Sequence, residues 1–134
     1  CPMLKISPFL AVQVFVTYSL INALQPAVLE QIRLTVVIPT YNEAANLPAM
    51  AAALFALPFV RMQLLVVDDN SPDGTADWVR RQNNYCATSD TDRSSSSIYL
   101  LQRSGKYGLG TATRDGLHWC LNRSYDFIVN WMLT

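Results

Sequence analysis

The chain has 134 residues, of which 51% are hydrophobic and 15% are charged, and ten basic side chains balance ten acidic ones. This length suits one domain with a hydrophobic core, and this composition excludes an intrinsically disordered polymer. A formal net charge of zero argues against a protein that holds nucleic acid by neutralising its phosphates.

The cysteines and the single histidine give little indication of metal binding or catalysis. Cys1, Cys86 and Cys120 are odd in number and lack the spacing of a metal site. Small secreted scaffolds contain a much higher density of cysteine, so we expect reduced thiols in a cytosolic protein. His118 has no catalytic partner near it in the sequence, and we expect it to be structural or exposed.

Residues 1–32 form an N-terminal extension of uncertain structure, which begins with Cys1 rather than Met. Its apolar stretch at residues 9–24 is interrupted by four polar residues. It falls short of the roughly 20 apolar residues that a membrane-spanning helix needs. Three interpretations stay open: a poorly packed extension, a core or interfacial helix, and a targeting or membrane segment. We also expect the chain to be a fragment or a processed product.

Apolar, β-branched runs alternate with helical patterns along residues 33–134. Strands are predicted at residues 34–38, 63–67, 98–101 and 125–129, and helices after Asn46, at 75–82 and around 109–120. This alternation is typical of βαβ units and predicts an α/β fold with a mostly parallel sheet flanked by helices. Pro39 should end the first strand, because it cannot donate to a ladder. The serine-rich residues 83–97 should form a mobile surface loop.

Polar residues follow the first two strands abruptly. The first run continues as IPTYNE at residues 38–43, and the second continues as VVDDNSPDGT at residues 66–75. Ligands of open α/β sheets bind beyond the carboxyl ends of the strands. Tyr41 could stack on a nucleobase there, although its local sequence fits a packing tyrosine in a loop slightly better.

Asp68 and Asp69 end a buried strand, where a carboxylate can accept hydrogen bonds from the edge of a base. Guanine offers two parallel donors for such a contact, and uracil offers one N–H group. Three alternatives stay open. Both acids could cap turns, the pair could bind a metal, or the pair could be the adjacent acids of a response-regulator receiver domain. The receiver domain requires a further phosphoacceptor strand end, and this sequence has a serine-rich loop instead.

Glycines at positions 105, 108 and 110 surround Lys106 ahead of a predicted helix. Backbone amides of a glycine-rich loop at a helix N-terminus attract phosphate. The spacing of glycine, lysine and threonine here is not that of a Walker A motif. The alternative interpretation is a flexible surface turn.

Together these segments resemble family-two glycosyltransferases of the GT-A type. The strings IPTYNE and VVDDNSPDGT are specific for that family, and GKYGLGTA at residues 105–112 narrows the resemblance to its dolichol-phosphate mannose synthase (polyprenol monophosphomannose synthase) branch. The resemblance extends from about residue 34 to residue 130. It implies that residues 33–134 are the incomplete N-terminal part of such a domain, the Rossmann-like GT-A nucleotide-binding half.

The resemblance also implies an activity. Mannose would be transferred from GDP-mannose to dolichyl or polyprenyl phosphate with inversion, and Mg²⁺ or Mn²⁺ would be the cofactor. The protein would be cytoplasmic, peripheral to the cytoplasmic face of the membrane. A transferase that uses another nucleotide sugar of the UDP-glucose type, and a noncatalytic nucleotide-binding remnant, remain alternatives.

The family pattern assigns roles to individual positions. Asp69 would hold the base, whereas Asp68 would orient the loop. Glu43 would contact the nucleoside side of the donor, although an acid near a helix N-terminus is also favourable by itself. Lys106 would offset the charge of the diphosphate, and Arg103 is a weaker candidate for that role. The positions implied for the nucleotide sugar are Pro39, Tyr41, Glu43, Val67 and Asp69, and those for the phosphate side are Lys106, Gly108 and Gly110.

One family motif is missing from the chain. The fourth strand of the family ends in an Asp-x-Asp motif, whose divalent metal bridges the donor phosphates. Here residues 130–134 read NWMLT and contain no carboxylate. We therefore expect no metal ligands and no catalytic residue in this chain, and we expect it to bind donor weakly without catalysis.

The replacement has a simple genetic explanation. The codons AAC ATG GAT GCT GAC encode Asn-Met-Asp-Ala-Asp, and loss of the A of ATG leaves AAC TGG ATG CTG AC, which reads NWMLT. We hypothesise a single-base deletion, in the gene or in its sequencing, because Trp and Met each have one codon. The unmatched residues 1–32 would then be translated upstream sequence. Resequencing that finds no ATGGATGCTGA remnant would contradict this hypothesis.

Overall fold

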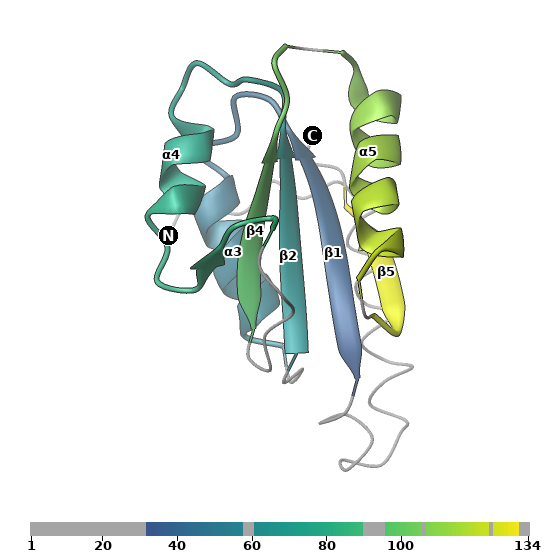
Figure 1. The fold of residues 1–134 in the computed structure, drawn as a ribbon. Coiled ribbons are helices and arrows are strands. Elements are labelled where there is room, and N and C mark those ends of the chain that lie inside the picture. Colours follow the sequence, from purple (N-terminus) through teal and green to yellow (C-terminus); the bar gives the residue numbers. More distant parts are fainter. Residues whose placement is uncertain (1–31, 58–60, 90–95, 106, 124, 132–134) are drawn as a thin grey trace.

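The computed structural model describes residues 32–57, 61–89, 96–105, 107–123 and 125–131, which are drawn in colour in Figure 1. Almost all of the expected extension at residues 1–32 lies outside the described residues. The same is true of Lys106 and of residues 132–134.

In the described part of the chain, five strands form one sheet in the order β3-β4-β2-β1-β5. Every strand pair is parallel, which confirms the predicted α/β class. The strands are β1 (Arg33–Thr40), β2 (Arg61–Asp68), β3 (Tyr85–Cys86), β4 (Ser97–Gln102) and β5 (Phe127–Asn130), and the helices are α3 (Leu47–Phe55), α4 (Thr75–Arg80) and α5 (Leu109–Leu121).

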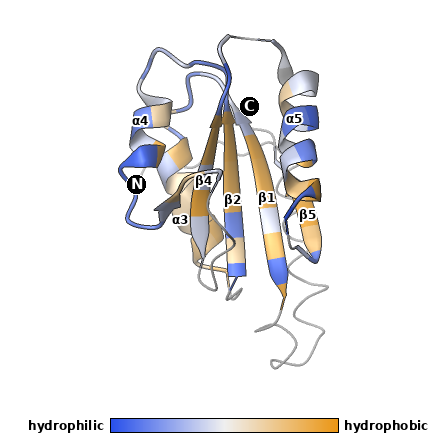
Figure 2. Ribbon diagram, in the orientation of Figure 1, coloured by the Kyte–Doolittle hydropathy of each residue, from blue (hydrophilic) through white to orange (hydrophobic). Residues whose placement is uncertain are grey.

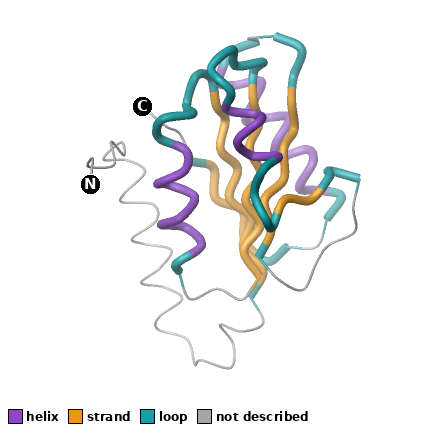
Figure 3. The backbone as a smooth tube through the Cα atoms, turned by 90° about the vertical axis from the view of Figure 1, so that its left-hand side faces the viewer, coloured by secondary structure: helices purple, strands orange, loops and turns teal. Residues whose placement is uncertain are grey.

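Alternate residues of the central strands face opposite sides of the sheet, as the two-residue repeat of a strand requires. Val36 and Ile38 pack in one cluster with residues of α3 and α4, whereas Val37 packs in a second cluster with residues of α5. Helices therefore cover both faces, as the edge-on view in Figure 3 shows. The two buried faces explain why β1 and β2 read as continuous apolar runs, which are orange in Figure 2.

Pro39 does not end the first strand, and this expectation was wrong. β1 continues to Thr40, and Pro39 is paired in register with Val67 of β2. In a parallel ladder the residues that bond one neighbour alternate with those that bond the other. The Thr40 carbonyl accepts from Asp69 N on the β2 side, and the Val37 carbonyl accepts from Trp131 N on the β5 side. The main chain of Pro39 faces β5, but it lies beyond the bond between the Val37 carbonyl and Trp131 N. The missing N–H of Pro39 therefore removes no ladder bond between the described strands.

Other boundaries also differ from the sequence prediction. The segment predicted as a loop over residues 83–97 contains β3, whose Tyr85 and Cys86 pair with β4. A strand of two residues is too short to leave a periodic signal. Helix α4 ends at Arg80, before the predicted residue 82. Asn46 occupies the N-cap of α3 as expected, but its side chain makes no capping bond. It donates instead to Glu43 Oε2 at 3.1 Å.

Helix α5 lies very close to the sheet at Gly116. A Cβ atom at this position would be 2.5 Å from Val37 Cγ1 and 3.1 Å from Val67 Cγ2. Neither valine can move easily, because both are completely buried. The absence of a side chain at Gly116 therefore sets the distance between α5 and the two central strands.

We predict that Gly116→Ala lowers the free energy of unfolding by roughly 1–3 kcal/mol, because the added methyl overpacks the contact with Val37. Gly110→Ala on the same helix is the matched control, since nothing lies within 4 Å of its new Cβ. The control should be neutral or more stable by up to about 1 kcal/mol, through helix propensity. Urea unfolding followed by circular dichroism measures both values. Equal stability of the two variants would contradict the close approach.

Candidate functional site

Three adjacent strands end level with one another at the carboxyl edge of the sheet. Thr40 of β1 is in register with Asp68 of β2, which is in register with Gln102 of β4. The next residue of each chain segment is therefore an aromatic ring at Tyr41, a carboxylate at Asp69 and a guanidinium at Arg103. These loops lie at the top of Figure 1 and are mostly hydrophilic in Figure 2.

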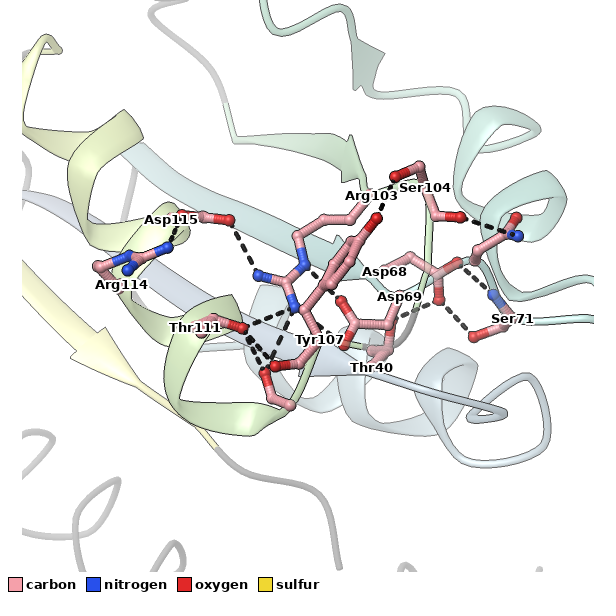
Figure 4. A network of polar contacts seen from close by, with 12 residues as sticks. Thr40, Asp68, Asp69, Ser71, Arg103, Ser104, Tyr107, Thr111, Arg114 and Asp115 are labelled. Atoms are coloured by element: carbon pink, nitrogen blue, oxygen red, sulfur yellow. Dashed lines mark hydrogen bonds and ion pairs between the residues drawn. The ribbon is translucent and has the colours of Figure 1, made fainter.

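Asp68 is completely buried and fastens the loops after β1 and β2 to each other. Its Oδ1 accepts from Thr40 Oγ1 at 2.8 Å and from Ser71 Oγ at 2.6 Å, and its Oδ2 accepts from Ser71 N at 2.9 Å. Ser71 Oγ in turn accepts from Asn42 N at 2.9 Å. Figure 4 shows the contacts of Asp68 with Thr40 and Ser71 to the right of its centre. Asp68 thus orients the loop, as expected.

Both loops turn through an asparagine in the left-handed region. Asn42 has φ 56° and Asn70 has φ 57°, and each lies two residues after the end of its strand. Asparagine adopts this conformation more readily than most residues with a side chain. The chain therefore turns in the same way after both strands, which keeps the two loops adjacent at the edge of the sheet.

Asp73 joins the second loop to the segment before α3. It accepts from Ala44 N at 3.0 Å and from Thr75 N at 3.1 Å, and Thr75 Oγ1 also donates to it. Thr75 Oγ1 is at the same time 3.2 Å from Glu43 N, a contact in which the hydroxyl oxygen accepts. Glu43 is half-buried, and its position next to α4 is fixed through its backbone.

Asp69 and Arg103 form a buried ion pair. Arg103 Nε donates to Asp69 Oδ1 at 2.6 Å, Arg103 Nη2 lies 3.1 Å from Asp69 Oδ2, and each side chain is 7% exposed. A carboxylate has about four lone-pair positions, so this fork leaves acceptor capacity on Asp69. Because the guanidinium of Arg103 is already paired with Asp69, it is not free to bind a phosphate. This pairing disfavours the role of offsetting the diphosphate charge, for which the family pattern made Arg103 a weaker candidate.

The other positions expected on the nucleotide-sugar side lie close to this pair. Tyr41 is 39% exposed just beyond β1. Pro39 and Val67 are buried and paired with each other, two residues before Tyr41 and Asp69 respectively. The register of the sheet therefore brings four of the five expected positions to one strand edge, and Glu43 follows in the next turn.

Of the positions expected on the phosphate side, Gly108 occupies the N-cap of α5 and Gly110 lies in its first turn. Gly108 has φ 96°, a conformation that residues with a side chain rarely adopt. Its carbonyl accepts from Ala112 N at 3.2 Å and lies 3.4 Å from Arg103 Nη2. Arg103 therefore connects the glycine loop with the carboxylate of Asp69, while Lys106 lies outside the described residues.

Sequence reasoning missed Thr111 and Asp115, which hold the outer side of the same guanidinium. Arg103 Nη2 is 2.9 Å from Thr111 Oγ1, and Arg103 Nη1 is 2.9 Å from Asp115 Oδ2. The hydrogen bond from Arg103 holds the pKa of Asp115 below its ordinary value, against the opposing effect of burial. The four-residue spacing of Thr111 and Asp115 was a signal, since such residues share one face of a helix.

Other expectations concern His118 and the cysteines. His118 is exposed on α5, as predicted. Cys86 and Cys120 are buried free thiols, which agrees with the expectation for these two residues. Burial raises the pKa of Cys120 to about 11, although Arg123 opposes the shift, so this thiol is a poor nucleophile at neutral pH.

The side chains of the described residues do not fit the divalent metal that the family pattern implies. Within the described residues, no group of three or more histidine, cysteine or acidic side chains could hold a metal ion. At the end of β5, Asn130 Nδ2 donates to Thr113 Oγ1 at 3.4 Å, and Trp131 is buried in the core. The sequence that follows, Met132-Leu133-Thr134, has no carboxylate. Hard divalent cations prefer oxygen ligands with carboxylates among them, and the end of β5 offers none.

The sequence profile of glycosyl transferase family 2 matches residues 35–131, and the chain belongs to this family. Undecaprenyl-phosphate mannosyltransferase of Micrococcus luteus is 42% identical over 98 residues, which are 72% of this chain and 36% of that protein. Polyprenol monophosphomannose synthase of Mycolicibacterium smegmatis is 40% identical over 98 residues, which are 72% of this chain and 33% of that protein. The chain thus spans about a third of the length of these relatives.

A solved structure supports the fold assignment. A mannosyltransferase from Pyrobaculum calidifontis, in complex with GDP-Man and Mn²⁺, is similar with a TM-score of 0.51 and 28% identity. The match covers 64% of this chain and 24% of that one. The described residues include no helix that combines the length and the apolar character needed to cross a membrane.

The loop contacts of Asp73 predict a pH dependence. Partial burial raises the pKa of Asp73, but hydrogen bonds from Thr75 and Ala44 outweigh it and hold the pKa below its ordinary value of 3.8. A carboxyl with a lowered folded-state pKa stabilises the fold above its unfolded pKa and loses that effect as the pH falls through the folded one. We expect Asp73→Asn to be less stable than the unmodified protein at pH 6. The difference should narrow below about pH 4.

Urea unfolding at several pH values between about 6 and 2.5 tests this expectation. Asp77→Asn is the control, because Asp77 is 70% exposed and pairs only with Arg80 among the described residues. A surface pair of this kind contributes little. A constant stability difference across the whole pH range for Asp73→Asn would contradict the assignment.

Proposed function

We propose that residues 33–134 form the N-terminal, nucleotide-binding part of a family 2 domain whose enzyme transfers mannose from GDP-mannose to polyprenyl or dolichyl phosphate. The observation that carries this proposal is the level ending of β1 and β2, which brings the segments that carry Tyr41 and Asp69 to one edge of the sheet. The 42% identity with an undecaprenyl-phosphate mannosyltransferase supports the choice of sugar and acceptor.

On the base side, we assign Tyr41 and Asp69 to the nucleobase. The exposed ring of Tyr41 offers a face for stacking, which every base can use. The buried carboxylate of Asp69 supplies selectivity, because it would reject a base that leaves its lone pairs unpaired. Guanine, with two parallel donors, satisfies this carboxylate better than uracil does. Pro39, Val67 and Glu43 would line the nucleoside side next to these two residues.

On the phosphate side, we assign the donor diphosphate to the glycine loop. Gly108 and Gly110 stand at the start of α5, where unpaired backbone amides and the helix dipole favour an anion. Lys106, two residues earlier in the sequence, would add a positive charge. This assignment is consistent with the short distance along the sheet edge between Asp69 and Gly108, which both contact Arg103.

The reaction would be a single displacement. An oxygen of the acceptor phosphate forms a bond to the anomeric carbon of mannose as the bond from that carbon to the diphosphate breaks. GDP leaves with the electron pair, and the configuration at the carbon inverts. The acceptor phosphate is already anionic, so the step needs no strong general base. We assign no catalytic residue within this chain.

The remaining parts of the proposal concern the setting of the enzyme. A polyprenyl phosphate acceptor is anchored in lipid, so the enzyme would work at the cytoplasmic face of a membrane without this region having to cross it. The complete enzyme would use Mg²⁺ or Mn²⁺, as the Pyrobaculum calidifontis structure with Mn²⁺ suggests for that protein. Residues 1–32 would be an extension outside the family domain.

We predict that the purified chain binds GDP more tightly than UDP and that Mn²⁺ and EDTA leave the affinity unchanged, because the described residues hold no carboxylate ligand set. Asp69→Asn should weaken GDP binding roughly 10- to 100-fold, by loss of a charged acceptor. Tyr41→Ala should weaken it roughly 5- to 100-fold, by loss of stacking. Isothermal titration calorimetry measures all of these affinities.

Asp77→Asn is the control variant, since its exposed carboxylate lies on α4 and pairs with Arg80. It should bind GDP like the unmodified chain. Circular dichroism establishes that each variant is folded before its titration is interpreted. A folded chain that binds neither nucleotide would contradict the proposed site, and tighter binding of UDP would favour a donor of the UDP-glucose type.

A further inference from the structure

The guanidinium of Arg103 contacts both halves of the proposed nucleotide site. On one side it forms the two-point contact with Asp69, at 2.6 Å and 3.1 Å. On the other side its Nη2 reaches Thr111 Oγ1 at 2.9 Å and the Gly108 carbonyl at 3.4 Å. The centre of Figure 4 shows the guanidinium between these groups.

The loop before α5 folds around this side chain. The ring of Tyr107 lies 5.2 Å from Arg103 Cζ, and the Tyr107 hydroxyl is 2.6 Å from Ser104 Oγ. Thr111 Oγ1 is 2.9 Å from the carbonyls of Tyr107 and Gly108 and can donate to one of them while it accepts from Arg103. The same guanidinium therefore contacts Tyr107, Gly108 and Thr111 at the start of α5.

The charge balance keeps that guanidinium in place. Burial by itself lowers the pKa of Arg103, but Asp69 and Asp115 outweigh burial and raise the pKa. The group stays charged between two carboxylates, and the Asp69 pair is almost fully removed from water. A buried pair of this kind is costly to break, because it leaves a charge without its partner. If Asp69 moves, Arg103 therefore moves with it, because little water can reach the pair to replace the lost contact.

We propose that Arg103 is a positioning residue that couples the base-side carboxylate Asp69 to the glycine loop on the diphosphate side. The inference rests on the proposed function, since it assigns the coupling to that nucleotide site. Binding of a nucleoside at Asp69 fixes the guanidinium, and the fixed guanidinium holds Gly108 and Thr111 in the conformation that receives the phosphates. Arg103 itself touches neither the base nor the phosphates.

The ligand test compares GDP with guanosine, because the ratio of their affinities measures what the diphosphate adds. Arg103→Lys keeps the charge but cannot contact Asp69, Thr111 and Asp115 together. We expect the ratio to fall by about 2- to 30-fold, the usual range for coupling between sites. Thr111→Val should lower the ratio while leaving the affinity for guanosine unchanged, since the Asp69 pair stays intact.

Arg114→Lys is the matched control. Arg114 is 74% exposed and contacts Asp115 at 3.5 Å, so the same substitution there should leave both affinities unchanged. A merely structural role of Arg103 would weaken both ligands equally, because it would only lower the fraction of folded protein. An unchanged ratio in folded Arg103→Lys would therefore overturn the coupling.

A second measurement needs no ligand and separates this inference from the proposed function. Asp69→Asn removes a charge that does not touch the loop, and we expect it to speed hydrogen exchange at the Ala112 amide, which donates to the Gly108 carbonyl. The expected change is about 2- to 30-fold, with Asp77→Asn as the unchanged control. Unchanged exchange in Asp69→Asn would overturn the coupling even if GDP binds. Faster exchange without GDP binding would support the coupling and contradict only the proposed nucleotide site.

Discussion

The candidate site depends on one constraint, the register of three parallel strands that end at the same level. Because Thr40, Asp68 and Gln102 are aligned, the residue after each strand projects from the same edge. A shift of one residue in any pair would move every side chain of the shifted strand to the opposite face of the sheet. The two buried faces prevent such a shift, since each apolar cluster requires its own set of alternating residues.

Two neighbouring acids illustrate how environment divides roles between identical side chains. The carboxylate of Asp68 accepts from Thr40 at the end of β1 and from Ser71 in the loop after β2, and it therefore maintains the framework. Asp69 pairs with a cation from another strand and retains acceptor capacity toward the sheet edge. The backbone explains the division, because successive residues of an extended chain point to opposite sides.

Much of the fold and part of the site could be predicted from local sequence. The strands β1, β2 and β4 were visible as apolar runs, and the loop-orienting role of Asp68 was implied by the family pattern. Features that depend on tertiary contacts could not be read in this way. Whether Pro39 ends a strand depends on which neighbour it faces, and β3 exists because β4 offers an edge. The partner of Asp69 is 34 residues away in the sequence, so only the register reveals Arg103.

The glycine loop is positioned by two contacts of different kinds. At its sheet face, α5 is held at a fixed distance because Gly116 has no side chain between it and Val37. At its first turn, the same helix is tied to β2 through Arg103, Asp69 and Thr111. The first contact is apolar and insensitive to a ligand, whereas the second consists of charges that a ligand can reorganise. A helix fixed along its length but adjustable at its N-terminus is well suited to transmit a change at Asp69 to the loop, without any movement of the sheet.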